Sequence, residues 1–326
     1  MHPAFSVIFL TTLLGVAQGL FLALVTGQYY SLANLIPAQD SATFYGMGSF
    51  LVLVFLGLGL FSSFFHLGRP ERAWRSATMW RTSWLSREVI ALPVFMCLVF
   101  LYGLAHYMQW NEPMFTIGDD VGIDLTIIIG LFASIAAFVL FICTAMIYAS
   151  VRFMQEWHHW LTVANYIFLG LTSGFTLAAA FTAWRGIELV NFFGFWAAFF
   201  LVAGLVTRGW SLYRNVTLKH KSTSSTAIGV RHNAVVQKSQ GSMGGNFNTR
   251  EFFHGQSEAV LKLVRYTFLV LVFAVPAVLL AAAWATASPY LPMIAFAVQY
   301  LGLLFERWYF FAEAKHPQNL YYQSIA

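Results

Sequence analysis

The sequence predicts an all-α fold, a polytopic membrane protein built as a bundle of eight transmembrane helices. Hydrophobic residues make up 59% of its 326 residues and charged residues only 10%, whereas about a quarter of the residues in a soluble domain are charged. The mean hydropathy is +0.68. Eight continuous apolar stretches of about 20 residues or more are long enough to cross a bilayer as helices. Such continuous stretches favour helices over a β-barrel, whose strands alternate polar and apolar side chains.

The apolar stretches follow one another along the chain. They cover residues 4–26, 44–66, 88–109, 122–150, 160–184, 190–212, 266–287 and 289–311. The first lacks a preceding basic region and is longer than the core of a signal peptide, so we expect it to be retained as a helix. Gly68 and Pro70 follow the second stretch and end it. Ser83 or Ser86 caps the third and leaves Glu88 in or near its first turn.

The basic residues divide unequally between the two sides of this bundle. With eight spans, both termini and the loops after the second, fourth and sixth helices share one side. That side carries 17 of the 18 Lys and Arg residues, and the other side keeps only Arg185. Because Lys and Arg concentrate in cytoplasmic loops, we expect this side and both termini to be cytoplasmic. The membrane orientation already explains why these loops are rich in Lys and Arg, so we expect no nucleic-acid partner.

The longest hydrophilic stretch, residues 213–264, is rich in Lys, Ser, Gly and Asn. A disordered connector is one interpretation of this composition. Against it, aromatic side chains alternate with charged ones near the end of the loop, which is typical of an ordered surface that docks partner subunits. The candidate docking residues are Asn248, Arg250, Glu251, Phe252 and Phe253.

The densest polar block runs from His66 to Ile90 and brings a histidine, several arginines and Glu88 to the membrane surface. An imidazole and a carboxylate at similar depth can accept and pass protons near neutral pH, as quinone chemistry requires. The 22-residue separation between His66 and Glu88 permits their contact. The structural alternative is that the arginines only enforce orientation, His66 is an interfacial aromatic residue, and Glu88 pairs with Arg87 or Arg72.

A second polar cluster lies near the end of the chain. Glu306 and Arg307 fall about one turn inside the last apolar stretch, and Glu313, Lys315 and His316 follow. Ionisable groups at such a depth tend to mark function. The alternative is a self-compensating pair of adjacent charges.

The chain offers few ligands for a metal cofactor of its own. Its two cysteines, Cys97 and Cys143, both lie in apolar stretches, and they are too few for an iron–sulfur cluster. None of its nine histidines lies in the middle of a predicted helix, where two facing imidazoles would hold a haem. We therefore expect no metal, haem or iron–sulfur cluster in this chain, and place redox centres of that kind in a partner.

Three motifs resemble the DmsC family, the membrane anchors of dimethyl sulfoxide reductase-type enzymes, related more distantly to NrfD-like anchors. They are HLGxPxRA at residues 66–73 followed by SxE at 86–88, GGxFNTREFFHG at 244–255, and FERWxFFAEAxH at 305–316. The resemblance covers essentially the whole chain. It implies an anchor of the bacterial cytoplasmic membrane that carries no metal, holds an iron–sulfur subunit and a molybdopterin subunit, and exchanges electrons with ubiquinone or menaquinone.

The resemblance also implies site residues. By motif position, His66, Gly68, Arg72 and Glu88 are the quinone-binding and proton-relay residues. Arg69 is a weaker candidate, because some family members have a small polar residue there. Weaker candidates elsewhere are Glu306 and Arg307, and His316 joins the docking residues. No residue is assigned a direct catalytic role.

The cytoplasmic position of the HLGxP loop makes the chain similar to the family's anchors that serve cytoplasmic sulfite oxidation. The expected function is to pass electrons from sulfite, through the iron–sulfur partner, to quinone. One alternative is an anchor of a DMSO or polysulfide reductase, which oxidises quinol. Alternatives of another class are a purely structural anchor, in which His66 and Glu88 are replaceable, and a transporter, which would require polar residues at mid-membrane depth.

Overall fold

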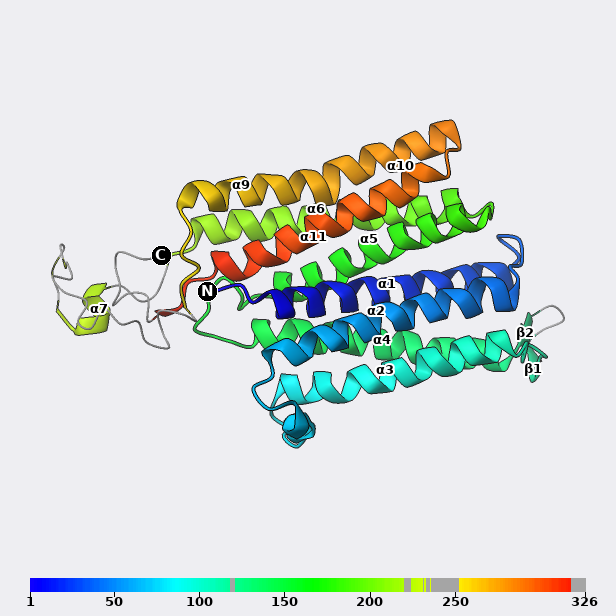
Figure 1. Ribbon diagram of the computed structural model, residues 1–326, viewed down its shortest axis with the longest axis horizontal. Coiled ribbons are helices and arrows are strands. Elements are labelled where there is room, and N and C mark those ends of the chain that lie inside the picture. Colours follow the sequence, from blue (N-terminus) through cyan, green and yellow to red (C-terminus); the bar gives the residue numbers. More distant parts are fainter. Residues whose placement is uncertain (118–120, 220–223, 231, 233–234, 236–251, 318–326) are drawn as a thin grey trace.

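The computed structural model describes residues 1–117, 121–219, 224–230, 232, 235 and 252–317. Long helices lie side by side along the longest axis of the molecule (Figure 1). Both the N-terminus and the end of α11 lie at one end of the bundle, which we call the terminal end, and a small β-hairpin lies at the opposite end (Figure 1).

The element order follows the apolar stretches closely. The elements are α1 (Phe5–Leu32), the π-helical turn η1 (Ser41–Gly46), α2 (Met47–Ser63), the 3-10 turns η2 (Phe64–His66) and η3 (Pro70–Ala77), α3 (Trp84–Tyr107), β1 (Phe115–Ile117), β2 (Val121–Ile123), α4 (Leu125–Ala149), α5 (Trp160–Arg185), α6 (Val190–Thr217), α7 (Ser224–Ile228), α9 (Glu258–Leu269), the π-helical turn η4 (Val270–Ala274), α10 (Val275–Thr286) and α11 (Tyr290–Glu313). β1 and β2 pair antiparallel, with Thr116 opposite Gly122.

Seven helical segments in the described part of the chain are long and apolar enough to cross a membrane. The eighth predicted span forms α11, which has 24 residues but is not one of these seven. It contains the polar residues Gln299, Glu306 and Arg307, which are buried in the bundle and lower its hydropathy. An all-helical membrane bundle is therefore confirmed, whereas the count of eight spans is not.

Several helices extend beyond the apolar stretches that predicted them. α6 continues to Thr217 and α9 begins at Glu258, which leaves a shorter connection than residues 213–264. Polar side chains can continue a helix outside the bilayer, so hydropathy marks only its apolar part. Of the two predicted caps for α3, Ser83 is confirmed, since its side chain accepts a hydrogen bond from the Ser86 N–H.

α1 and α5 form the centre of the bundle, since most of their apolar windows are buried inside the protein. Glycines at four-residue spacing let their backbones approach closely: a Cβ atom at Gly19 or Gly174 would clash with the backbone of the other helix. Small residues at such spacing are typical of tight helix pairs in membranes.

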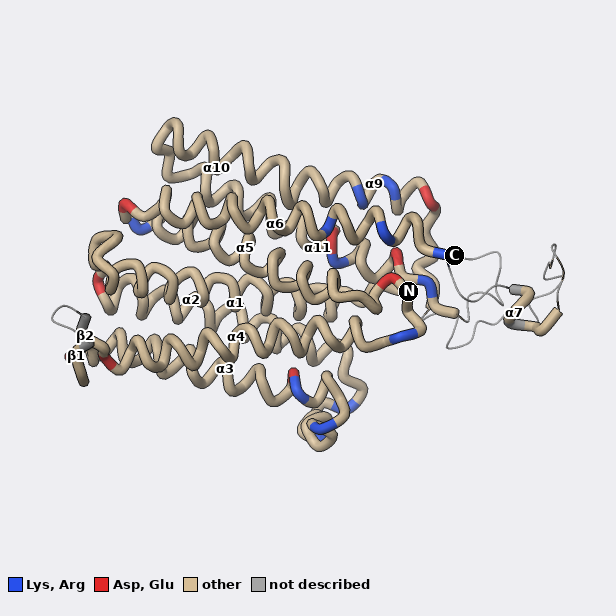
Figure 2. The backbone as a smooth tube through the Cα atoms, turned by 180° about the vertical axis from the view of Figure 1, so that it is seen from behind, with Lys and Arg blue, Asp and Glu red and all other residues tan. Residues whose placement is uncertain are grey.

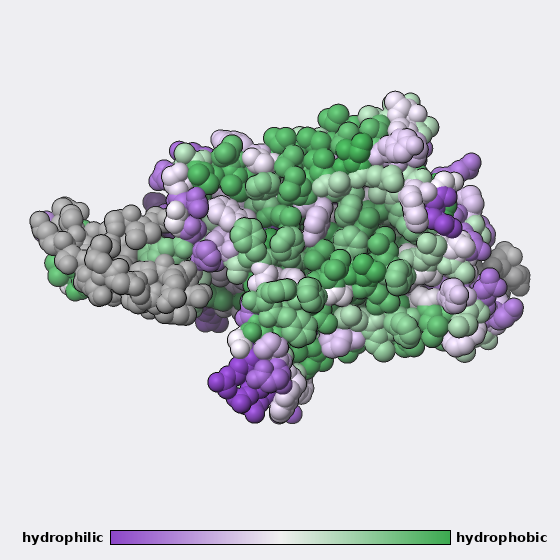
Figure 3. Space-filling model, in the orientation of Figure 1, coloured by the Kyte–Doolittle hydropathy of each residue, from purple (hydrophilic) through white to green (hydrophobic). Residues whose placement is uncertain are grey.

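Charged residues gather at the terminal end of the bundle (Figure 2). Hydrophobic residues cover the middle of the face shown in Figure 3, and η3 forms a hydrophilic protrusion beside it. This arrangement is that of a bundle whose apolar belt faces lipid and whose ends face water.

Candidate functional site

The HLGxPxRA block lies on the surface at the terminal end. His66 ends η2, and Gly68, Arg69 and Arg72 are exposed on the way into and along η3. A Cβ atom at Gly68 would meet no described residue within 4 Å, so packing in the described part of the chain does not require a glycine there. Arg72 lies 3.8 Å from the carboxylate of Glu71, and both side chains are about half exposed or more, so this ion pair is weak.

Glu88 differs from these residues because it is buried inside the bundle, with 8% of its surface exposed. The Thr144 hydroxyl on α4 donates a hydrogen bond of 2.5 Å to Glu88 Oε1. Arg87 points elsewhere and donates to the carbonyl oxygens of Trp80 and Arg81. Among the described residues, no hydrogen bond or ion pair joins Glu88 to His66, Arg72 or Arg87. Thr144 is a partner that the sequence did not predict.

An apolar groove of about 660 Å³ runs between α3 and α4. Its lining is almost entirely apolar, with Trp80, Trp84 and Arg87 at the end toward η3. Cys143 contributes to the wall, and the next residue, Thr144, holds Glu88. A buried carboxyl group therefore lies beside the polar end of a groove that is open to lipid.

These residues fit a quinone in two respects. The groove suits an isoprenoid tail, and the Glu88 carboxyl group is a buried group able to hold or release a proton beside it. Neither Glu88 nor His66, Gly68, Arg69 and Arg72 lines the groove itself. Glu88 lies close to it, because the adjacent Arg87 lines the groove and its partner Thr144 follows Cys143 of the wall.

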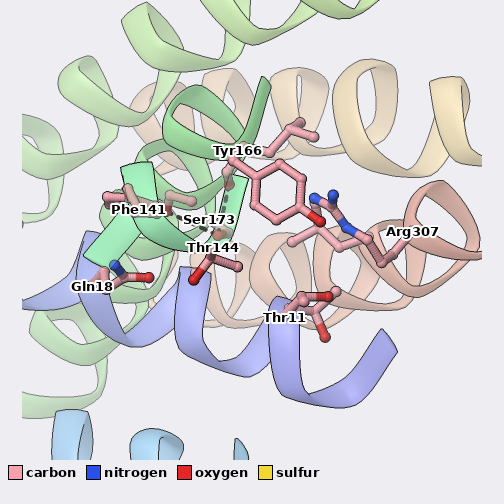
Figure 4. Close-up of a pocket in the computed structure, with 12 residues that line it drawn as sticks. Thr11, Gln18, Phe141, Thr144, Tyr166, Ser173 and Arg307 are labelled. Atoms are coloured by element: carbon pink, nitrogen blue, oxygen red, sulfur yellow. Dashed lines mark hydrogen bonds between the residues drawn. The ribbon is translucent and has the colours of Figure 1, made fainter. Parts of the chain in front are cut away.

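A second, smaller cavity of about 20 Å³, with polar and apolar side chains in its walls, lies deeper in the bundle (Figure 4). It is enclosed by α1, α4, α5 and α11, and its walls include the side chains of Thr11, Thr144, Tyr166, Ser173 and Arg307 (Figure 4). Thr144 thus contacts this cavity as well as Glu88.

The Glu306–Arg307 pair is buried and includes a third charge from another helix. Arg208 of α6 places its Nε 2.8 Å from Glu306 Oε1, and Arg307 Nη2 lies 3.5 Å from Glu306 Oε2. The Arg307 guanidinium also lies 3.9 Å from the centre of the Tyr166 ring. From the sequence, Arg208 is predicted only to help set the orientation in the membrane. Its position near the end of an apolar stretch could have indicated that it needs a buried partner.

The cluster continues to a solvent-accessible pocket at the terminal end, which we call the terminal pocket. Arg208 Nη1 lies 3.9 Å from Glu313 Oε2. Glu313 lines the terminal pocket, which has a volume of about 650 Å³ and is also lined by Met1, Asn215 and Arg265.

Three of the candidate docking residues, Asn248, Arg250 and Glu251, lie outside the described residues. The others contact their own chain at the terminal end. Phe252 stacks on His316 with ring centres 3.7 Å apart, and Phe253 is buried. Burial lowers the pKa of both His254 and His316.

Comparison with known proteins gives the family. The model of the family described as DMSO reductase anchor subunit (DmsC) matches residues 1–312. A subunit of the sulfite dehydrogenase of Allochromatium vinosum is 60% identical over 326 residues, which is the full length of both chains. The resemblance predicted from the three motifs is confirmed: the chain belongs to the DmsC family and is a membrane anchor subunit of an oxidoreductase.

Proposed function

We propose that this chain is the quinone-reactive anchor of a three-subunit molybdopterin oxidoreductase, and that it passes electrons from cytoplasmic sulfite oxidation, through an iron–sulfur partner, to ubiquinone or menaquinone. The single observation that carries the proposal is the buried Glu88 carboxyl group, held by Thr144 beside an apolar groove open to lipid. Sulfite as the substrate of the complex is supported by the 60% identity to the sulfite dehydrogenase subunit of Allochromatium vinosum.

In this proposal the residues have distinct roles. Quinone, when bound, takes up two electrons and two protons and becomes quinol. Residues of α3 and α4 bind its tail in the groove, and Glu88 holds a proton beside it. His66, Gly68 and Arg72, which are exposed in and between η2 and η3, belong to the face that receives the iron–sulfur subunit. The distribution of Lys and Arg supports a cytoplasmic position for this face and both termini, in a bacterial inner membrane.

The experiment is to purify the chain with its neighbours after gentle solubilisation, identify them, and measure sulfite-dependent quinone reduction. A molybdopterin subunit, an iron–sulfur subunit and quinone reduction that depends on sulfite are expected. A complex that oxidises quinol with a sulfoxide or polysulfide would contradict the direction of electron flow, and a complex indifferent to quinone would indicate a structural anchor.

A further inference from the structure

The cavity between α1, α4, α5 and α11 has room for a water molecule. Its volume is about 20 Å³, and a cavity of roughly 10–15 Å³ or more, measured in this way, holds one water if polar groups surround it. Thr11, Gln18, Thr144 and Ser173 supply such groups (Figure 4).

Two groups in the wall of this cavity need a hydrogen-bond partner. The hydroxyl of Tyr166 and Nε of Arg307 are buried and make no hydrogen bond of normal geometry among the described residues, although the two side chains lie against each other. Only 5% of the surface of Tyr166 and 4% of that of Arg307 are exposed. Buried polar groups are almost always paired with protein or with an ordered water, so a water in the cavity would satisfy them.

Thr144 connects the same cavity to Glu88. Its single hydroxyl proton is donated to Glu88 Oε1, which leaves the oxygen lone pairs of Thr144 to accept a hydrogen bond. Since Thr144 also lines the cavity, a water there can donate to Thr144 while Thr144 donates to Glu88.

On the other side of the cavity, a series of charged side chains extends from the interior of the bundle to the terminal pocket. Arg307 pairs with Glu306, Glu306 with Arg208, and Arg208 approaches Glu313 at the terminal pocket. Arginines stay protonated, so their role is to hold the carboxylates in place. Glu306 and Glu313 are the groups in this series that can exchange protons.

We propose that an ordered water in this cavity links Tyr166 and Thr144 to Glu88, and that protons reach Glu88 from the terminal pocket through the interior of the bundle. For each proton that Glu88 gives up, the Thr144 hydroxyl passes one to Glu88 and takes one from the water. The water regains its proton from the Tyr166 hydroxyl, Tyr166 takes one from Glu306, and Glu306 takes one from the terminal pocket by way of Glu313, so every group returns to its starting state. This inference rests on the proposed quinone reaction, and Thr144 and Tyr166 act in it as positioning and relay residues.

The sharpest test fills the cavity without touching any relay group. Gly15 lines the cavity, and a Cβ atom there would meet only the Gly170 Cα, at an ordinary 3.7 Å. In the purified complex we expect Gly15→Ala to slow quinone reduction by about tenfold and to change its solvent deuterium isotope effect, with KM for quinone unchanged. Gly194→Ala, in α6 with open space around it, is the matched control.

A second set of variants removes the hydroxyl groups. We expect Thr144→Val and Tyr166→Phe to show the same loss, and Thr144→Ser to retain activity. Thr176→Val is the control, because this buried hydroxyl donates to the Thr172 carbonyl away from the cavity. Activity with an artificial electron acceptor reports assembly of each variant. Wild-type rates of quinone reduction in Gly15→Ala, Thr144→Val and Tyr166→Phe, together with slow quinone reduction in Glu88→Gln, would overturn the interior proton route but not the proposed function. A wild-type rate in Glu88→Gln would overturn the proposed function itself.

Discussion

Nε of Arg208 lies 2.8 Å from Oε1 of Glu306 in the interior of the bundle, and 1% and 2% of the two side chains are exposed. Breaking a buried ion pair leaves one charge without a partner, at a cost of about 3–5 kcal/mol. We expect Arg208→Met to lower the thermal stability of the purified protein strongly. Glu306 keeps Arg307 as its second partner in this variant, whereas Glu306→Gln removes the carboxylate that two buried arginines share, so we expect Glu306→Gln to destabilise the protein more. A Glu306→Gln variant more stable than Arg208→Met would contradict this account.

The groove between α3 and α4 gives a prediction for affinity. Ala91 and Ala136 line it from the two helices. A phenylalanine at either position occupies the space assigned to the quinone tail, so we expect KM for quinone to rise by about tenfold, with activity toward an artificial acceptor unchanged. Ala281→Phe, at an exposed position of α10, is the matched control. An unchanged KM in both groove variants would place the tail elsewhere.

The terminal end gives a prediction for pH. Burial lowers the pKa of His316, helped by the positive N-terminus, and burial lowers the pKa of the Met1 amino group to about 6. A histidine whose pKa is lowered by folding stabilises the folded form above the unfolded pKa of about 6.5, and this contribution is lost as the pH falls below that value.

Acid should therefore loosen the stack of Phe252 on His316. We expect hydrogen-exchange protection of the segment around Phe252, corrected for intrinsic rates, to fall between about pH 7.5 and 5.5. His316→Phe keeps an aromatic ring in the stack and removes the titration of His316, so its protection should depend on pH less than that of the wild type, with the remainder due to His254 and the Met1 amino group. Equal pH dependence in wild type and variant would contradict the role of His316.

The orientation is tested by labelling with a membrane-impermeant thiol reagent. The native Cys97 and Cys143 lie within α3 and α4. We expect Glu112→Cys, between α3 and β1, to react from outside the cell and Lys219→Cys, beyond α6, to react only after the membrane is opened. The reverse pattern would place the HLGxP block outside and remove the support for cytoplasmic sulfite.

Much of the fold could be predicted because hydropathy depends on local composition. The apolar stretches, the cap at Ser83 and the family motifs each depend on residues that are close together in the sequence. The partners of buried polar groups could not be predicted in this way, because such pairs join distant parts of the chain: Thr144 lies 56 residues after Glu88. Arg208 and Glu306 are likewise brought together only when α6 and α11 assemble in the bundle. His66, close to Glu88 along the chain, remains at the surface.

The most direct test of the central claim is sulfite-dependent quinone reduction by the purified complex carrying Glu88→Gln. We predict intact assembly, full activity toward an artificial acceptor, and quinone reduction slowed by about a hundredfold, because the variant keeps the shape of the side chain and loses its proton. His66→Ala, in the face proposed to receive the iron–sulfur subunit, should slow quinone reduction as well, and Glu112→Gln, an exposed carboxylate between α3 and β1, should not. Quinone reduction at the wild-type rate in Glu88→Gln would contradict the account.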